Sequence, residues 1–413
     1  MKYAKIVTQL PHFKDLELLK NLNKYEAHSM QGQIPVVWDK AKDFLVWDRH
    51  GNQFIDFTSG ICVANCGHGN RDVMNAIRKK INRPLAHSYT FGTEVRYNFI
   101  KELIETCYPK GKAFLVSAGT EATEVAVKLM KSYGLKKGRN VIYSVKGAMH
   151  GRTMLAERLK GETKENSWAF NTNEEYKDVG YINPFQENIE SFINIFDNGK
   201  SRGVAGIIIE SYQGWSAKFY PKQYIQYLVK WAKNNDILVC FDEIQGGFGR
   251  TGKMFAYEHY DIDRPDLICL GKGISSSVSL SGVIGRKDII DCVDVGSMSS
   301  THSANPIACS AGLANLKYLK KHKLVERSAK LGYSMINFLT DYLGLKVEGN
   351  GLLCAIHTEN EKEADRIVMK CFKKGLLLIR THKNSVKIAP PLTITDEALT
   401  EGLEIIASVV KEK

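Results

Sequence analysis

Three apolar runs of the sequence lead into residues that can do chemistry. These runs, with the residues that they carry, are KAFLVSAG (112–119) before Thr120, ILVCFDE (237–243) with Asp242, and DLICLGKG (266–273) with Lys272. An amine and a carboxylate are groups that covalent and acid–base catalysis commonly use. In open α/β sheets, ligands bind at the carboxyl ends of the strands, which is where these residues would lie. Lys272 follows Asp242 by 30 residues, a separation that fits the next strand of such a sheet.

Each of these residues also has an ordinary structural explanation. An aspartate at the end of a strand is often only a cap. A lysine between two glycines is usually a surface turn residue, and SAGT (117–120) is a common strand-to-helix turn. Their occurrence in one predicted sheet, in this order, is much more specific than any one of them alone.

The elements that must position these residues alternate along the middle of the chain. Apolar residues recur at helical spacing in 120–133 and 221–236, while 141–145, 204–210 and 282–285 are continuous apolar runs. This alternation predicts an α/β fold with a mostly parallel sheet between helices.

The chain length and the change of pattern at both ends predict a second, smaller domain. A chain of 413 residues is long for a single core. Residues 59–305 are predicted to form the large domain. Residues 306–413 turn helical and then form short strands, and residues 1–58 contain a hairpin pattern about Gly51-Asn52. We expect the two ends together to build a smaller α+β domain.

Composition excludes several classes of protein. The 57 Lys and Arg residues exceed the 45 Asp and Glu residues, giving a formal net charge of +12. The densest basic segment, residues 316–323, has the pattern of a solvated helix face, so we expect no nucleic-acid partner. The nine cysteines form no CxxC pair and the histidines have no zinc-like spacing, so we expect neither a disulfide framework nor a metal site.

The same sequence predicts a cytoplasmic protein without a membrane partner. Its longest apolar stretches are too short to cross a bilayer. The first fifteen residues have no continuous apolar core of the kind found in signal peptides.

A long segment around Asp242 and Lys272 resembles a known family signature. FDEIQGGFGRTGKMFAYEHYDIDRPDLICLGKGIS (241–275) looks like the signature of class III pyridoxal-phosphate (PLP) aminotransferases, which include ornithine, acetylornithine and 4-aminobutyrate aminotransferases. Further matching segments are 52–70, 117–129, HGRT (150–153), QG (213–214), STHSANP (300–306) and PPLTIT (390–395). The resemblance covers essentially the whole chain. It implies fold type I, PLP as cofactor, and a homodimer with shared active sites.

The resemblance implies a role for each matching residue. Lys272 would bond to PLP through its amine and later carry a proton, and Asp242 would keep the pyridine nitrogen protonated. Gly119 and Thr120 would bind the phosphate at a helix N-terminus, and Thr301 would reach the phosphate bound by the partner subunit. The other residues expected at the cofactor are Ala118, Met149, His150, Glu210, Gln213, Ile244 and Gln245.

Three positions depart from the family pattern and bear on the substrate. Met149 stands where an aromatic residue usually stacks on the cofactor ring, so that Met149 and Ile244 would hold the ring between two aliphatic groups. Trp215 stands where the glutamate-handling members have an acidic residue, and Lys387 replaces an arginine that grips a carboxylate. Trp215, Lys387 and Arg380 are therefore the candidate substrate-binding residues.

Three functions remain open at this point. The first is an aminotransferase that moves an amino group from an amino acid or ω-amine to a 2-oxo acid or aldehyde by a ping-pong mechanism. The second is a PLP-dependent lyase, such as a phospho-lyase, or an amino-acid epimerase of the same family. The third is a nucleic-acid-binding protein with a vestigial site, which the positive charge alone suggests.

Overall fold

The computed structural model describes residues 1–32, 34–83, 85–164, 166–170, 178–196, 200–381 and 383–412, without the side chains of residues 200 and 201. The chain forms two compact units. Unit 1 comprises residues 1–71, 249–252 and 322–413, and unit 2 comprises residues 72–248 and 253–321. Both chain ends therefore belong to unit 1.

Unit 2 is built on a seven-stranded sheet whose strand order is β4-β12-β11-β10-β7-β5-β6. Its strands are β4 (Lys112–Val116), β5 (Val141–Val145), β6 (Val179–Ile182), β7 (Val204–Glu210), β10 (Leu238–Asp242), β11 (Leu267–Leu270) and β12 (Ser281–Gly285). All pairs are parallel except those of β12, which is antiparallel to β11 and to β4. Every residue of β7, β10, β11 and β12 is buried, so helices and loops cover both faces of this part of the sheet. The predicted α/β fold is confirmed.

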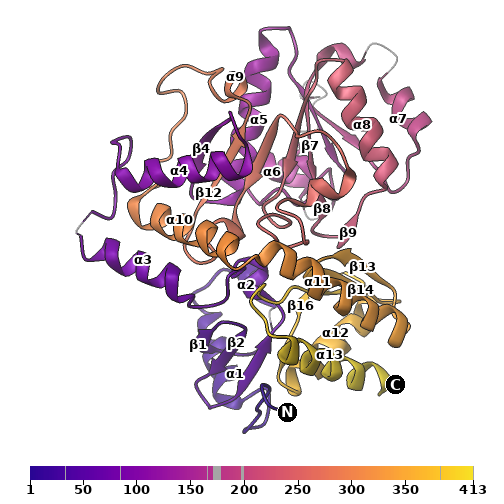
Figure 1. Cartoon of the computed structure of the whole chain (residues 1–413). Helices are drawn as coiled ribbons and strands as arrows, with labels where there is room; N and C mark the ends of the chain where they lie inside the picture. The colour runs from indigo at the N-terminus through magenta and orange to yellow at the C-terminus, as the bar shows by residue number, and fades with distance from the viewer. Residues whose placement is uncertain are drawn as a thin grey trace. The chain divides into compact units, whose positions relative to one another are not determined.

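The helices of unit 2 are labelled in Figure 1, and those at Gly119–Leu135 and Lys222–Asn234 lie close to the predicted ranges 120–133 and 221–236. They are α3 (Arg71–Ile81), α4 (Glu94–Cys107), α5 (Gly119–Leu135), α6 (Met154–Leu159), α7 (Ile189–Phe196), α8 (Lys222–Asn234), α9 (Lys287–Ile290) and α10 (Pro306–Lys321). Short 3₁₀ turns are η2 (Ser167–Ala169), η3 (Lys200–Gly203), η4 (Ala256–Tyr260) and η5 (Lys272–Ile274), and a small hairpin joins β8 (Tyr212–Gln213) to β9 (Lys218–Phe219). Helix α5 packs across the strands through Ala122, Ala126, Leu129 and Met130, which recur at helical spacing and are fully buried.

Unit 1 contains two four-stranded sheets. The first has the order β1-β2-β3-β15, from β1 (Trp38–Lys42), β2 (Leu45–Asp48), β3 (Gln53–Asp56) and β15 (Leu376–Leu377). The second has the order β13-β14-β17-β16, from β13 (Val347–Asn350), β14 (Leu353–His357), β17 (Ser385–Ile388) and β16 (Ile379–Arg380). The predicted hairpin about Gly51-Asn52 is confirmed, since β2 and β3 pair antiparallel and Gly51 adopts a positive φ of 90°.

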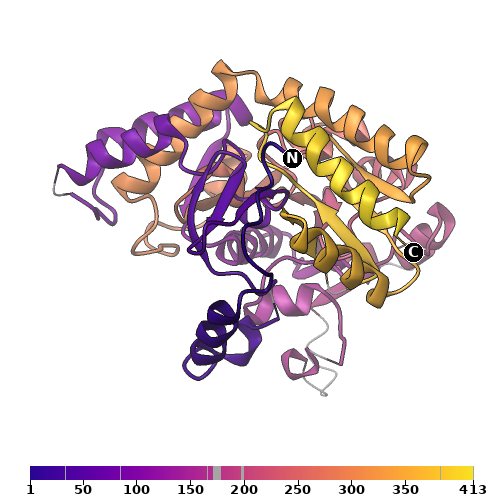
Figure 2. The ribbon, with the colours of Figure 1, turned by 90° about the horizontal axis from the view of Figure 1, so that it is seen from below.

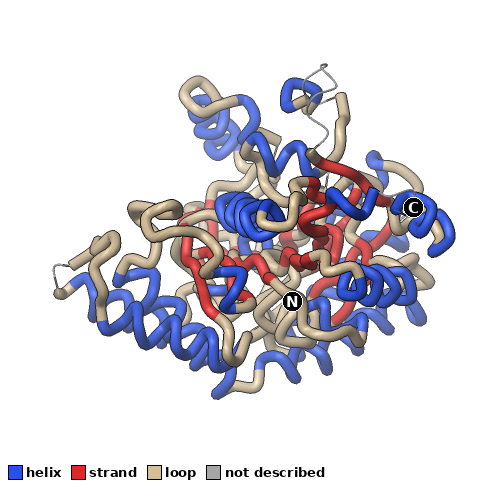
Figure 3. The backbone as a smooth tube through the Cα atoms, turned by 90° about the horizontal axis from the view of Figure 1, so that it is seen from above, coloured by secondary structure: helices blue, strands red, loops and turns tan. Residues whose placement is uncertain are grey.

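The helices of unit 1 are α1 (Phe13–Leu22), η1 (His28–Met30), α2 (Ser59–Cys62), α11 (Leu324–Asn337), a π-helical turn (Phe338–Tyr342), α12 (Glu361–Lys373) and α13 (Asp396–Lys411). Helices α12 and α13, drawn in gold and yellow in Figure 2, pack against each other. Figure 3 draws the strands of both units in red and the helices in blue.

The borders between the units differ from the predicted borders in three places. Residues 59–71 belong to unit 1, helix α10 belongs to unit 2, and residues 249–252 belong to unit 1 although they follow a strand of unit 2. Arg250 explains the last difference, because its fully buried guanidinium donates to Asn65 Oδ1 (2.7 Å), Ser59 Oγ (3.1 Å) and two backbone carbonyls of unit 1. No local pattern of apolar residues signals such an insertion.

Candidate active site

The ends of three adjacent parallel strands bring the predicted catalytic residues to one edge of the sheet. Asp242, the last residue of β10, stands in register with Glu210, the last residue of β7, and with Cys269 on β11. Lys272 follows β11 by two residues, as the sequence predicts, and its backbone adopts a left-handed φ of 43°. A non-glycine residue in this region is strained, and such strain concentrates at functional sites.

The Asp242 carboxylate is held in place by two donors. Nδ1 of His150 lies 2.8 Å from its Oδ2, and the backbone N–H of Ile244 donates to its Oδ1 at 3.0 Å. A carboxylate offers about four lone pairs, so two remain for a further donor. A protonated ring nitrogen is such a donor, and Asp242 therefore fits the role that the resemblance implies.

His150 is fully buried beside two acids. Burial alone would lower its pKa, but the hydrogen bond to Asp242 and the charges of Asp242 and Glu210 raise the pKa above the ordinary value. A protonated imidazole would balance part of the negative charge collected at these strand ends.

The Glu210 carboxylate joins two segments of the site. It accepts the backbone N–H of Met149 at 2.8 Å through Oε2 and the N–H of Gly214 at 2.8 Å through Oε1. Burial raises its pKa, an effect that His150 and the two N–H groups oppose. Glu210 thus positions both the residue predicted to contact the cofactor ring and the turn that carries Trp215.

Ile244 packs against the two glycines that flank the candidate cofactor position. A Cβ at Gly119 would lie 3.1 Å from Ile244 Cδ1, and a Cβ at Gly271 would lie 3.1 Å from Ile244 Cγ2. The absence of side chains at Gly119 and Gly271 lets the aliphatic group reach between the start of α5 and Lys272.

The N-terminus of α5 has the features of a phosphate site. Its first N–H groups, including those of Gly119 and Thr120, have no acceptor within the helix, and the helix dipole favours an anion there. Glu121 accepts the N–H groups of Ser117 (2.8 Å) and Ala118 (3.1 Å), which fixes the preceding turn. The HGRT turn packs tightly against Thr120, since a Cβ at Gly151 would lie 2.2 Å from Thr120 Oγ1.

Two glutamines also lie at this edge of the sheet. Gln213 is buried and donates its amide N–H to the carbonyl of Lys146 at 3.0 Å. Gln245 lies beside Gly214, where a Cβ would come within 3.2 Å of its Oε1 and 3.0 Å of Glu210 Oε1. Glu210, Gly214 and Gln245 therefore form one cluster.

Trp215 has two cationic neighbours that sequence reasoning missed. The guanidinium carbon of Arg152 lies 5.9 Å from the indole centroid, and Nζ of Lys160 lies 5.6 Å from it. Both distances are within the range of a cation–π interaction. Arg152 was visible in the HGRT segment, but only the fold shows that it lies beside residue 215.

Thr301 lies in an exposed turn, where its carbonyl oxygen is 2.7 Å from Nε2 of His87. Among the described residues, the structure records no contact between Thr301 and the residues around Asp242.

Two of the predicted substrate residues lie in unit 1. Lys387 is buried on β17, in register with Ala355 and Ile379. Arg380 forms a two-pronged ion pair with Asp365 of α12, with N–O distances of 2.7 Å and 2.5 Å. The guanidinium is thus already engaged, which sequence reasoning did not anticipate.

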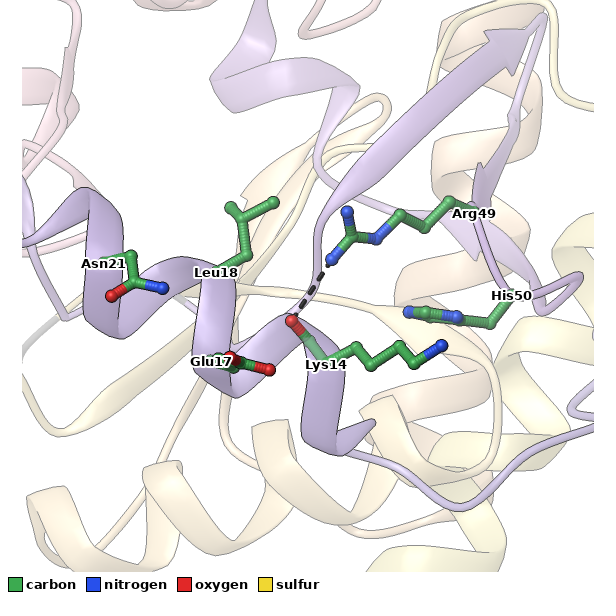
Figure 4. Close-up of a pocket in the computed structure, with 6 residues that line it drawn as sticks. All are labelled: Lys14, Glu17, Leu18, Asn21, Arg49 and His50. Atoms are coloured by element: carbon green, nitrogen blue, oxygen red, sulfur yellow. Dashed lines mark hydrogen bonds between the residues drawn. The ribbon is translucent and has the colours of Figure 1, made fainter.

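Unit 1 also has an open groove of about 560 Å³ between α1 and the β2–β3 turn (Figure 4). Lys14, Glu17, Leu18 and Asn21 line it from the helix, and Arg49 and His50 line it from the turn. Arg49 Nη2 donates to the carbonyl of Lys14 at 3.1 Å. None of the predicted site residues lines this groove.

Within the described residues, no helix combines the length and the apolar character that a membrane span requires. In the same part of the chain, no group of three His, Cys, Asp or Glu side chains has an arrangement suited to a metal ion.

Comparison with known proteins decides the family. The pattern of the "Aminotransferase class-III" family matches residues 26–410. The chain is a class III aminotransferase. Ornithine aminotransferase of Saccharomyces cerevisiae is 31% identical over 94% of this chain and 96% of its own length, and 5-aminovalerate aminotransferase of Pseudomonas aeruginosa is 33% identical over 92% and 95%. The crystal structure of ornithine aminotransferase from Toxoplasma gondii superposes with a TM-score of 0.87 at 26% identity, covering 97% of this chain and 96% of that one.

Membership establishes the chemistry. This aminotransferase depends on PLP and catalyses transamination, and the aminotransferase relatives do not favour the lyase, epimerase or nucleic-acid-binding alternatives. The free lone pairs of Asp242 and the open N–H groups of α5 fit the ring nitrogen and the phosphate of PLP.

Proposed function

We propose that Lys272 is the catalytic lysine of this aminotransferase and that Asp242 is the charge partner of the cofactor ring. The observation that carries this proposal is the meeting of Asp242, Glu210 and Lys272 at the ends of β10, β7 and β11. PLP supplies an electron-withdrawing ring that stabilises negative charge on the carbon next to the amine nitrogen. The Asp242 carboxylate holds a proton on the ring nitrogen, and the Lys272 amine moves a proton to and from the substrate carbon.

The remaining roles follow the geometry of unit 2. Met149 and Ile244 hold the two faces of the ring, and Gly119 and Thr120, with Ala118 in the same turn, bind the phosphate. His150 orients Asp242, while Glu210 orients Met149 and Gly214. The other two residues of the cofactor pocket are Gln213 and Gln245.

For the substrate, we propose an amine whose reacting nitrogen is separated by several carbons from a carboxylate. Ornithine and 5-aminovalerate, named in the relatives, share this arrangement. The Trp215 ring, with Arg152 and Lys160 beside it, provides an apolar surface for the carbon chain of the substrate and two cations for its anionic end. Lys387 remains a candidate for a second carboxylate, and Arg380 becomes one only if it leaves Asp365.

We also propose a cytoplasmic homodimer in which Thr301 reaches the phosphate of the partner subunit. Five large apolar side chains are exposed within 17 residues of α3, α4 and their connection, which is unusual for a free surface. They are Ile81, Leu85, Tyr89, Phe91 and Tyr97. The described cysteines are all free, as in a reducing compartment.

A spectroscopic titration tests the assignment of the catalytic residue. The protein is supplied with PLP, and the visible absorbance is compared between the wild type, Lys272→Ala and a matched surface variant, Lys101→Ala. We expect the protein-bound absorbance band in the wild type and in Lys101→Ala only. A band of unchanged position and intensity in Lys272→Ala would refute the assignment.

An amine screen then tests the substrate class. Addition of 5-aminovalerate, 4-aminobutyrate or ornithine is expected to bleach the bound band, whereas simple alkylamines of the same length are expected to act far more weakly. Equal responses to both kinds of amine would contradict a site for an anionic end.

A further inference from the structure

Glu243, the residue next to Asp242, is fully buried and belongs to none of the roles described so far. Its carboxylate accepts three donors from two separate segments of unit 2. The N–H of Tyr257 donates to Oε1 at 2.7 Å, the N–H of Ala256 donates to Oε2 at 2.9 Å, and the hydroxyl of Ser211 donates to Oε1. When the carboxylate is ionised, these hydrogen bonds are charge-assisted, which makes them the stronger kind in proteins.

These hydrogen bonds hold together the two ends of the connection between β10 and η4. Glu243 stands immediately before Ile244 and Gln245, while Ala256 and Tyr257 begin η4. Ser211 follows Glu210, so the same carboxylate also ties the end of β7 to this connection.

The neighbouring glycines show how closely the chain passes the carboxylate. A Cβ at Gly246 would lie 3.1 Å from Glu243 Oε2 and 2.8 Å from Ala256 Cβ. A Cβ at Gly247 would lie 2.7 Å from the carbonyl oxygen of Glu243. The path after Gln245 is therefore fixed by Glu243 and tolerates no side chain at residues 246 and 247.

We propose that Glu243 is a positioning residue that sets the cofactor-facing conformation of Ile244 and Gln245. This inference rests on the proposed placement of PLP at Asp242 and Lys272. Glu243 itself does not touch the cofactor and acts through the two residues that follow it.

Two variants disrupt the hydrogen bonds between Glu243 and the start of η4, one by changing the acceptor and the other by changing a donor. Glu243→Gln places an NH₂ group opposite an N–H donor, because each carboxylate oxygen accepts one of the two backbone N–H groups. Ala256→Pro acts from the other side, because it removes the backbone donor and places the proline Cδ where the N–H hydrogen points at Oε2. Proline suits this position, since Ala256 is the first residue of η4 and Phe255 before it is extended at φ −128° and ψ 146°.

The test is a double-mutant cycle on PLP affinity between residues 243 and 245 in the full chain. We expect Glu243→Gln to weaken PLP binding about tenfold in the wild-type background and by less than about threefold in the Gln245→Ala background. Ala256→Pro should follow the same pattern, and the melting temperatures of the cofactor-free variants confirm that they are folded. Equal losses in both backgrounds, or no loss in either, would overturn the proposal.

A second readout separates this proposal from the assignment of the catalytic site. Amide hydrogen exchange of residues 244–257 in the cofactor-free protein is expected to accelerate about tenfold in Glu243→Gln relative to the wild type, with no change in α8. Unchanged exchange at residues 244–257 would show that the Glu243 hydrogen bonds do not hold this segment, even if PLP binds at Lys272. Faster exchange in Glu243→Gln, together with equal PLP absorbance in the wild type and Lys272→Ala, would refute the catalytic assignment. The role of the Glu243 hydrogen bonds in holding residues 244–257 would still be supported.

Discussion

Nδ1 of His150 lies 2.8 Å from Oδ2 of Asp242, and both side chains are buried. Because an ionised carboxylate can only accept, the imidazole nitrogen carries the proton of this contact. With the N–H of Ile244 on the other oxygen, the orientation of Asp242 is set before any cofactor binds. The site is therefore preorganised for a ring nitrogen that must stay protonated.

Removal of the His150 donor should weaken the cofactor site. We expect His150→Leu to weaken PLP binding about tenfold, because Asp242 loses a charge-assisted hydrogen bond. His150→Asn, which places an amide N–H near the position of Nδ1, should recover most of that loss. Equal affinities of His150→Leu and the wild type, measured by absorbance titration, would contradict the role of this contact.

The Glu210 carboxylate should affect both the binding of PLP and the binding of the amine substrate. Glu210→Ala removes both acceptors at once, because the backbone N–H groups of Met149 and Gly214 donate to separate oxygens of this one carboxylate. We expect a rise of about tenfold in both the PLP dissociation constant and the KM for the amine. An effect on only one of these quantities would show that Glu210 does not join the two segments.

Arg152 and Lys160 should govern the recognition of the anionic end of the substrate. Arg152→Ala is expected to raise the KM for an ω-amino acid about tenfold or more, with a smaller effect on kcat and none on PLP affinity. The matched control is Arg78→Ala, which removes an exposed arginine from α3. An unchanged KM in Arg152→Ala would place the anionic end elsewhere, with Lys387 as the next candidate.

Glu243 should make the stability of the fold depend on pH. Burial raises its pKa from 4.5 to about 7, so the native state keeps this proton over a range in which the unfolded chain has lost it. Its contribution to stability is therefore full below pH 4.5 and declines toward pH 7 by about 1.4 kcal/mol per unit. Urea unfolding of the wild type and Glu243→Gln at pH 5, 6 and 8 should show the variant gaining relative stability as the pH rises. A constant difference between the two proteins would contradict this titration.

The exposed apolar side chains between α3 and α4 should mediate dimer formation. A charge at Phe91 or Leu85 would be desolvated in such an interface, so Phe91→Asp and Leu85→Asp are expected to yield monomers in sedimentation experiments. Tyr333→Asp, at an exposed apolar residue of α11 in unit 1, is the matched control. A wild type that sediments as a monomer would contradict the proposed dimer.

Local sequence patterns predicted much of the fold because they report burial directly. The helix expected over residues 120–133 is observed as Gly119–Leu135, and the strand expected over 204–210 is observed without change. The antiparallel direction of β12 and the assignment of residues 249–252 to unit 1 escaped prediction, since both are decided by contacts distant in sequence.

The candidate site could likewise be predicted only where local sequence determines the position of a residue. Asp242 and Lys272 were visible because Asp242 ends a strand and Lys272 follows one, and the end of a strand is fixed by local sequence. Arg152 beside Trp215, and Asp365 beside Arg380, were not predicted because each pair joins distant segments. Glu243 was missed for another reason, since its partners are backbone N–H groups that any sequence would offer.

Reductive trapping of the cofactor tests the central claim most directly. The protein is incubated with PLP, treated with borohydride and digested, and the peptide that carries the added mass is identified by mass spectrometry. We predict that the modification lies on Lys272 and that Lys272→Ala acquires none at equal PLP concentration. Modification of a different lysine in the wild type, with Lys272 unmodified, would contradict the account.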